Sequence, residues 1–371
     1  MSKQTGGTPF TPHSTTSGMI GGGFYDANSA AQWKAIEAVL PLVNKAAASL
    51  PIEGTGTVGL ADFGCSEGRN SIAVMQQALA ILLPRTKRPV QTVHSDLPSN
   101  DFSKLFLTLG AGRQKAFDSE QVFSAAVGGS MFDQLLPDSS VHLATTFNAI
   151  GFLSRRPVDS LPGYILPNGP STARGNGYVS EEDRNAFADQ AKRDVGAFLK
   201  ARSRELVPGG KLLVQVFGGN EDARTCDGIY DLLNDAVLAS VGTGDIAAET
   251  YDRYYQAVYM RTLAELTAPV TKDRYGASGL FQIEDTKSYE VAVPFNERYA
   301  ADGDLDRYAT DYVNFFRAFT EAVLKAALPA TADRDRLVDR IYDRAVELLK
   351  ANPERYPFRY IAIAMLLTRT G

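Results

Sequence analysis

The sequence predicts an α/β fold with a mostly parallel sheet, helices on both of its faces and a helical cap inserted into the sheet domain. Up to about residue 220, apolar segments of strand length alternate with segments of helical apolar spacing, a pattern typical of parallel sheets. Beyond that point the spacing becomes mainly helical, and strand-like segments return near the C-terminus. The chain has 371 residues, 44% of them hydrophobic, which is enough to bury a large core.

The elements of the first half follow in order. Residues 1–22 are expected to form a flexible arm, and a helix follows at 28–50 with Ser29 as a possible cap. A long helix at 181–206 ends at the glycine-containing turn "VPGG". The strands are expected at 56–63, 90–96, 121–127, 140–148 and 211–218, and two further helices at 69–83 and 100–109.

The second half is expected to form the cap and then to return to the sheet. Helices are expected at 228–241, 249–266, 305–328 and 334–349, and strands at 280–293 and 358–369. The corresponding division is a sheet domain at 23–220, a mainly helical cap at 221–330, and a last helix and strand at 331–371. Ligand sites in such sheets form beyond the carboxyl ends of the strands.

Composition and charge argue against several classes of function. The formal net charge is -5, so the chain offers no strongly basic surface to a nucleic-acid backbone. Two cysteines make no disulfide framework, and three histidines show no zinc-ligand spacing. The apolar run at 360–367 is too short to cross a bilayer, and residues 1–20 contain no signal-peptide core. We therefore expect a cytoplasmic protein without a nucleic-acid or membrane partner.

The turn after the first predicted strand, "ADFGCSEGRNS" at 61–71, carries a chemical signal. Its glycines allow a ligand to approach the backbone closely, and the helix that follows directs free N–H groups at it. The spacing from Gly64 to Gly68 does not match the dinucleotide fingerprint G-x-G-x-x-G. A carboxylate at the strand end, Asp62, suits a cationic cofactor better than a pyrophosphate, and S-adenosylmethionine is such a cofactor.

A second acid, Asp96, stands at the tip of the next predicted strand, in "VHSDLP". An acid at this place in a nucleotide-binding sheet accepts hydrogen bonds from both ribose hydroxyls. Each feature alone has a structural explanation, since such turns are common and Asp96 could cap a helix. Their position on consecutive strands favours a methyltransferase.

Longer motifs then resemble one family. The segments "ADFGCSEGRNS", "SDLPSNDFSKLF", "AVGGSMFDQLLPDSSVHLATTFNAIGFLSRRP" and "FLKARSRELVPGGKLLVQVFG" resemble the SABATH methyltransferases, the salicylic acid, benzoic acid and theobromine type. "FYDANSAAQ" and "ANPERYPFRYIAIAMLLTR" are similar to the family's first and last motifs, so the resemblance covers almost the whole chain. It implies a Rossmann-like methyltransferase sheet with the cap over the acceptor pocket, in a bacterial-type member.

The resemblance also implies site residues. The positions that match the family's cofactor residues are Tyr25, Asn28, Asp62, Gly64, Cys65, Ser66, Asn70, Asp96, Leu97, Ser130, Met131, Thr146 and Phe147. Those that match its acceptor pocket are Gln32, Asn148, Gly151, Phe152 and Tyr230. In this mapping Gln32 hydrogen-bonds an acceptor carboxylate, and Gln32 and Phe152 position the acceptor for catalysis.

Some positions depart from the family pattern. The family's tyrosine and tryptophan in H-S-S-Y-S-L-x-W-L-S become Asn148 and Phe152, and phenylalanine lacks the indole N–H donor. A pocket tryptophan of the cap aligns with Tyr230. Of the oxygen ligands that bind magnesium in some members, only Asp252 is kept, so we expect no metal site.

These observations predict an S-adenosylmethionine-dependent methyltransferase that esterifies the carboxylate of a small, largely apolar acid. Such an acid is ionised at neutral pH, so no general base is expected. Positioning of the acceptor and exclusion of water then supply most of the catalysis. Two alternatives stay open: methylation of a nitrogen or hydroxyl of a small molecule, and a non-catalytic S-adenosylmethionine-binding protein. The resemblance suggests a homodimer.

Overall fold

The computed structural model describes residues 19–110, 115–174 and 177–371, and it contains a seven-stranded sheet in the order β3-β2-β1-β4-β5-β7-β6. Most of the expected arm, residues 1–18, lies outside the described residues. Strands β1 to β5 are parallel to one another, and β7 runs antiparallel to both β5 and β6. The strands are β1 (Val58–Phe63), β2 (Val90–Asp96), β3 (Val122–Gly128), β4 (Val141–Phe147), β5 (Leu206–Phe217), β6 (Phe281–Val291) and β7 (Tyr360–Arg369).

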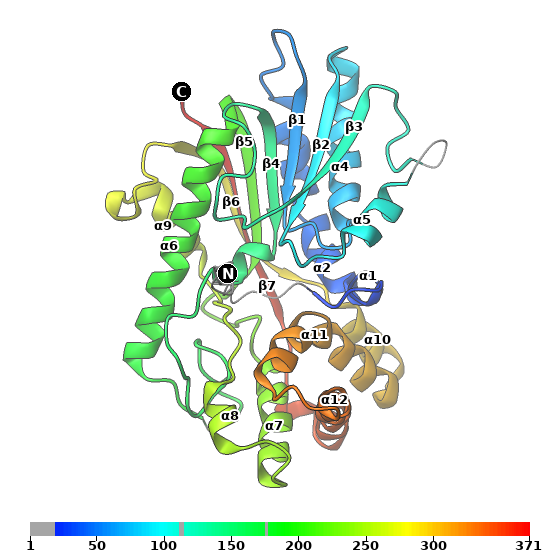
Figure 1. Ribbon diagram of the computed structural model, residues 1–371, viewed down its shortest axis with the longest axis vertical. Helices are drawn as coiled ribbons and strands as arrows, with labels where there is room; N and C mark the ends of the chain where they lie inside the picture. Colours follow the sequence, from blue (N-terminus) through cyan, green and yellow to red (C-terminus); the bar gives the residue numbers. More distant parts are fainter. Residues whose placement is uncertain (1–18, 111–114, 175–176) are drawn as a thin grey trace, which may run out of the picture.

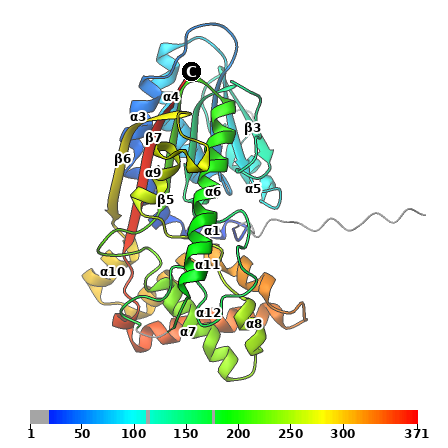
Figure 2. The same cartoon turned by 90° about the vertical axis from the view of Figure 1, so that its left-hand side faces the viewer.

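Helices cover both faces of this sheet, as Figures 1 and 2 show. One apolar core joins one face to α2 (Ala30–Glu37), α3 (Leu40–Ala48), α4 (Arg69–Leu82) and α5 (Phe102–Leu109). A second core joins the other face to α6 (Glu181–Glu205) and α9 (Leu263–Thr271). Because side chains alternate between faces along a strand, Leu60 of β1 enters the first core and Ala61 the second. The α/β fold with helices on both faces is confirmed.

The cap lies beyond the carboxyl ends of β1 to β5, at the bottom of Figure 1. It contains α7 (Ile229–Gly242), α8 (Ala248–Arg253), α10 (Pro294–Asp302), α11 (Leu305–Ala327) and α12 (Arg334–Ala351). A third apolar core, rich in aromatic residues, holds these helices together; Tyr230, Tyr312 and Ile341 are members. A short helix, α1 (Phe24–Asn28), packs beside α11.

Two expected helices are interrupted. The helix expected at 28–50 is divided into α2 and α3 at Ala38 and Val39, because Pro41 in the first turn of α3 cannot continue a preceding helix. The helix expected at 249–266 ends at Arg253, and a non-helical segment, residues 254–262, separates α8 from α9. This segment hydrogen-bonds to other parts of the chain instead, with the N–H of Gln256 donating to the carbonyl of Ile165. Tertiary contacts thus override its helical spacing.

The division into domains differs in detail from the expected one. Strand β6 falls inside the expected cap range, yet it pairs with β7 along ten residue positions at the sheet edge. Helix α9 also lies in that range and packs on the sheet with α6. Helix α12, expected to return to the sheet domain, packs against α7 and α11 in the cap. The cap is therefore interleaved with the sheet rather than inserted as one continuous segment.

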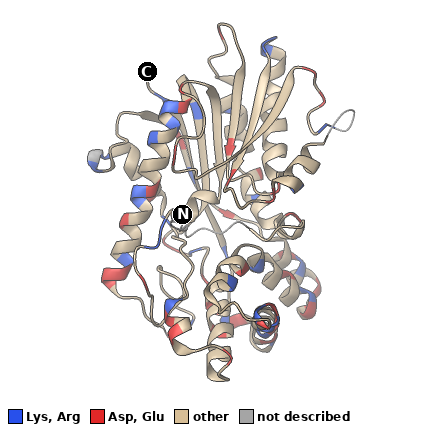
Figure 3. Cartoon of the chain, in the orientation of Figure 1, with Lys and Arg blue, Asp and Glu red and all other residues tan. Residues whose placement is uncertain are grey.

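Charged residues lie mostly on the outer helices, whereas the strands are largely uncharged, as Figure 3 shows. This pattern follows from the cost of burying an unpaired charge. Within the described ranges, no helix combines the length and the apolar character that a membrane span requires.

Candidate functional site

A cavity of about 340 Å³ lies between the carboxyl ends of β1, β2 and β4 and the cap. Twelve of the residues expected in the site line it: Tyr25, Gln32, Gly64, Ser66, Asp96, Leu97, Ser130, Met131, Phe147, Asn148, Phe152 and Tyr230. These residues come from the N-terminal helices, from four strand ends and from α7. The fold thus brings the sheet-end motifs and the cap motifs to one cavity.

The turn after β1 forms one end of the cavity. The N–H groups of Gly64 and Cys65 both donate to the carbonyl of Ser95, at 2.8 and 3.0 Å, and so join the turn to β2. Gly64 has φ 96, and a Cβ there would lie 2.2 Å from Cβ of Ala149. A side chain at Gly64 is therefore excluded by both strain and contact.

Asp96 holds the same turn from the tip of β2. Its Oδ2 accepts a hydrogen bond from the backbone N–H of Ser66, and its Oδ1 accepts one from the backbone N–H of the next residue, Leu97, both at 2.7 Å. Burial raises the pKa of Asp96, and these two N–H groups counteract part of that rise. Each carboxylate oxygen still has a free lone pair for a further donor, and the residue lines the cavity.

Ser66 gives an independent indication of a ligand-binding site. Its φ is 49, a conformation that residues other than glycine seldom adopt. Its Oγ is enclosed without a hydrogen-bond partner in the described part of the chain, although the residue lines the cavity. Buried hydroxyls are normally paired, so the turn fits a bound polar molecule such as S-adenosylmethionine.

Six expected residues are not among those that line the cavity: Asn28, Asp62, Cys65, Asn70, Thr146 and Gly151. Asp62 is buried behind the turn, where Oγ1 of Thr145 donates to it at 2.7 Å, and burial raises its pKa to about 6. The hydroxyl of Thr146 donates to the carbonyl of Phe63, and Nδ2 of Asn28 to the carbonyl of Phe24.

Of the three remaining expected residues that do not line the cavity, the structure explains the places of Cys65 and Gly151. Burial raises the pKa of the Cys65 thiol well above its ordinary value, so the residue stays a protonated packing group. Gly151 leaves room for the ring of Phe217, which would lie 2.0 Å from a Cβ at that position. Gly151 therefore shapes the cavity through Phe217, which lines it. Nothing in the structure assigns a contact to Asn70.

Glu67 connects the turn to α1. It is almost fully buried, its Oε1 accepts the N–H of Gly23 at 2.6 Å, and its Oε2 accepts the N–H of Asp26 at 3.4 Å. Arg69 adds a hydrogen bond from its guanidinium to the carbonyl of Asp26. Glu67 thereby fixes the helix that carries Tyr25 over the cavity.

The apolar end of the cavity contains residues that the sequence did not single out. Phe217 ends β5, Tyr360 begins β7, Ile229 begins α7, and Phe315 and Phe319 lie on α11. Further residues of the wall are Met19, Ser95, Gly129, Phe132, Asp133, Ala149, Ser154, Thr225 and Met260. These residues come from segments far apart in the chain, and no local pattern marks them.

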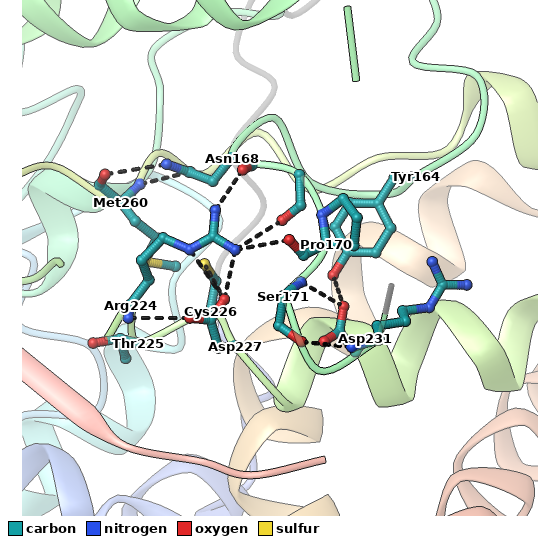
Figure 4. A network of polar contacts seen from close by, with 12 residues as sticks. Tyr164, Asn168, Pro170, Ser171, Arg224, Thr225, Cys226, Asp227, Asp231 and Met260 are labelled. Carbon is teal, nitrogen blue, oxygen red and sulfur yellow. Dashed lines mark hydrogen bonds and ion pairs between the residues drawn. The ribbon is translucent and has the colours of Figure 1, made fainter. Parts of the chain in front are cut away.

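Met260 lines the cavity, and Asn168 holds its backbone through two hydrogen bonds, which Figure 4 shows. Oδ1 of Asn168 accepts the N–H of Met260 at 2.9 Å, and Nδ2 donates to its carbonyl at 3.2 Å. Arg224 in turn donates to the carbonyls of Asn168 and Pro170. This network ties the 254–262 segment to the residues that precede α7, and Thr225 among these also lines the cavity.

The cavity wall is poor in charge. Among its described residues are two acids, Asp96 and Asp133, and neither a lysine nor an arginine. Across the described ranges, His, Cys, Asp and Glu side chains form no group of three or more that could hold a metal ion. A ligand anion at the apolar end would therefore meet neutral side chains.

Comparisons with known proteins agree with this geometry. Residues 15–370 match the model of a family described as SAM dependent carboxyl methyltransferase. Jasmonate O-methyltransferase of Arabidopsis thaliana is 25% identical over 94% of this chain and 96% of its own. The S-adenosyl-L-methionine:benzoic acid/salicylic acid carboxyl methyltransferase 3 of Petunia hybrida is 26% identical over 93% and 95%.

A solved structure shares the fold over nearly its whole length. Loganic acid methyltransferase with SAH covers 95% of this chain and 99% of its own, with a TM-score of 0.76 and 22% identity. The fold and the cavity define a Rossmann-like methyltransferase. The chain belongs to the S-adenosylmethionine-dependent carboxyl methyltransferases, the family that its motifs resemble, and is therefore an S-adenosylmethionine-dependent enzyme.

Proposed function

We propose that this enzyme transfers the methyl group of S-adenosylmethionine to the carboxylate of a small, largely apolar acid that carries a single negative charge. The observation that supports this acceptor is the wall of the cavity. Its acceptor end combines aromatic and aliphatic side chains, among them Phe152, Phe217 and Met260, with the amides of Gln32 and Asn148. Such a surface suits an apolar body with one polar head.

Within the described wall of the cavity no side chain can balance the charge of the acceptor, so we assign this task to the cofactor. The described wall has no lysine or arginine, whereas S-adenosylmethionine carries a sulfonium at the reacting centre. A second carboxylate on the acceptor would be buried without a partner, at a cost of several kcal/mol. We therefore infer a preference for monocarboxylic acids over dicarboxylic acids.

The side chains have a positioning task rather than an acid–base task. An acid with a pKa near 4 is already ionised at neutral pH, so the enzyme needs no proton acceptor for it. Gln32 is 5% exposed and its Oε1 has no partner in the described part of the chain. Rotation of the Gln32 amide group by about 180° exchanges its oxygen and its NH2 group. We propose that the NH2 group faces the cavity and donates to the acceptor carboxylate.

The cofactor end is assigned on the same basis. We propose that Asp96 accepts hydrogen bonds from the ribose hydroxyls and that Ser66 Oγ pairs with the cofactor. Tyr25, Leu97, Ser130, Met131 and Phe147 would enclose it, since all line the cavity. The names of the relatives indicate the acids to try first: jasmonate, salicylate and benzoate.

The experiment is a turnover panel with methyl-labelled S-adenosylmethionine. Benzoate, salicylate and jasmonate are compared with phthalate as a dicarboxylate, and with benzylamine and benzyl alcohol as nitrogen and hydroxyl acceptors. We expect methyl esters from monocarboxylates and little or no transfer to phthalate. Transfer to benzylamine or benzyl alcohol but to no acid supports the alternative chemistry. Cofactor binding without any transfer contradicts turnover of this class of acceptor.

Three further properties stay predictions. We predict a homodimer, and light scattering at several protein concentrations would measure the molar mass that tests it. A cytoplasmic location can be tested by fractionation of the source cells. The bacterial-type membership has no support from the relatives named above, which are plant proteins.

A further inference from the structure

The amide of Asn148 has an orientation that its neighbours fix. Asn148 follows β4 with φ 62, a left-handed conformation that asparagine tolerates better than most residues. Its Oδ1 accepts the N–H of Phe217 at 3.2 Å and the hydroxyl of Tyr360 at 3.1 Å. The backbone N–H of Phe217 can only donate, so the atom that faces it must be the oxygen.

The other end of the amide is then available to a ligand. Gln215 also donates to Oδ1, at 3.4 Å, so all the contacts of the amide are made by its oxygen. In the described part of the chain Nδ2 meets no acceptor, and it is not among the fully enclosed polar atoms that lack a partner. Because Asn148 lines the cavity, its Nδ2 can reach a ligand there.

A carboxylate in this cavity needs such a donor. Phe152 carries none, and the described wall has neither lysine nor arginine. A carboxylate can accept about four hydrogen bonds, and the amide of Gln32 alone satisfies only part of this number. Two N–H bonds of Asn148, held in place by β5 and β7, complete the set without adding a charge.

We propose that Nδ2 of Asn148 donates to the acceptor carboxylate beside Gln32, and that Tyr360 positions it by holding Oδ1. This inference rests on the proposed carboxyl methylation and assigns its acceptor specificity to one side chain. A donor pair in this place selects an oxygen anion and disfavours an amine, whose N–H groups would meet other donors.

The test is Asn148→Asp, assayed with the best acid of the panel. The substitution keeps an oxygen for the Phe217 N–H and the Tyr360 hydroxyl, but it replaces the donor by a negative charge. At pH 8 we expect kcat/KM to fall by about 100-fold or more, because a buried donor is lost and two anions meet. The affinity for S-adenosylhomocysteine, measured by calorimetry, should stay within about twofold of wild type.

The pH profile separates donation from structure. Burial in a wall whose described residues include no lysine or arginine raises the pKa of the introduced carboxyl, and its protonated form donates again. The ratio of variant to wild-type kcat/KM should therefore rise at least tenfold from pH 8 to pH 5.5. Tyr360→Phe should raise KM several-fold with little change in kcat, because Oδ1 keeps the Phe217 N–H.

The outcomes distinguish the two proposals. A wild-type protein that methylates none of the acids contradicts the proposed function, and this inference falls with it. In a second outcome the wild-type protein methylates an acid, and the Asn148→Asp variant has the same kcat/KM at pH 8 with intact cofactor binding. This result contradicts only the role of Asn148. A loss that stays the same at every pH also contradicts donation, since a merely structural defect would not follow the protonation of the introduced carboxyl group.

Discussion

The backbone N–H of Ser66 donates to the carboxylate of Asp96 at 2.7 Å, across 30 positions of the chain. This hydrogen bond joins the turn after β1 to the tip of β2 and shapes the end of the cavity that we assign to the cofactor. A hydrogen bond that orders a binding site lowers the conformational entropy lost on binding. The contact is therefore the first place to test the cofactor assignment.

Asp96→Ala should weaken the binding of S-adenosylhomocysteine by about 10- to 100-fold. The substitution removes the expected acceptor of the ribose hydroxyls and frees the N–H of Ser66, and charge-assisted hydrogen bonds contribute about 1.5–3 kcal/mol. Calorimetric titration measures the change, and Asp118→Ala, at an exposed position, is the control. Unchanged affinity in a folded Asp96 variant contradicts the ribose assignment.

Glu67→Ala should weaken the cofactor complex through Tyr25. Loss of the carboxylate leaves the N–H groups of Gly23 and Asp26 without their acceptor, so α1 is held less firmly over the cavity. We expect a loss of several-fold to tenfold in S-adenosylhomocysteine affinity, of the order of one buried hydrogen bond. Both residues act through one helix. The loss of binding free energy in the double variant Tyr25→Ala/Glu67→Ala should therefore be smaller than the sum of the losses in the two single variants. Full additivity argues against this coupling.

Asp62→Asn should stabilise the ligand-free protein at neutral pH. Burial raises the pKa of Asp62 from 3.8 to about 6. Between those values the folded chain keeps a proton that the unfolded chain has released, so this residue lowers the free energy of unfolding as the pH rises from 4 to 6. Asparagine has no such dependence, and at pH 7.5 the variant should be more stable by about 1–3 kcal/mol.

Urea unfolding at pH 4 and at pH 7.5 checks this difference, which should nearly vanish at pH 4. Asp138→Asn is the matched control, since Asp138 is 64% exposed. Equal stability of the Asp62 variant and wild type at both pH values shows that Asp62 does not titrate as its burial implies.

Gln32→Ala and Phe152→Trp test the acceptor end from opposite directions. The first removes a buried amide and should lower kcat/KM for the best acid by about 10-fold or more, with S-adenosylhomocysteine binding nearly intact. The second adds an indole N–H and should keep or improve the methylation of simple aromatic acids. If Gln32→Ala methylates the best acid at the wild-type rate, the carboxylate is held elsewhere and nitrogen or hydroxyl acceptors become the better proposal.

The sequence located the sheet and the turns around Gly64 and Asp96 better than the apolar end of the cavity. The motifs around Gly64 and Asp96 lie at consecutive strand ends, so their proximity follows from parallel pairing alone. Phe217, Met260 and Phe315 meet only through tertiary packing, and Met260 belongs to a segment whose helical spacing is misleading. Local patterns cannot report contacts that depend on the placement of the cap.

The uncharged cavity wall has a consequence for the order of events. An acid should bind tightly only after S-adenosylmethionine has brought its sulfonium, and a non-reactive cationic analogue of the cofactor should strengthen acid binding more than neutral S-adenosylhomocysteine does. Calorimetry with each cofactor form makes the comparison. After transfer, the sulfonium has become a thioether and the carboxylate has become an ester. The electrostatic attraction between the two ligands is therefore lost when the methyl group is transferred. Because the reacting groups of both products are uncharged and the described wall holds no lysine or arginine, both products should leave readily.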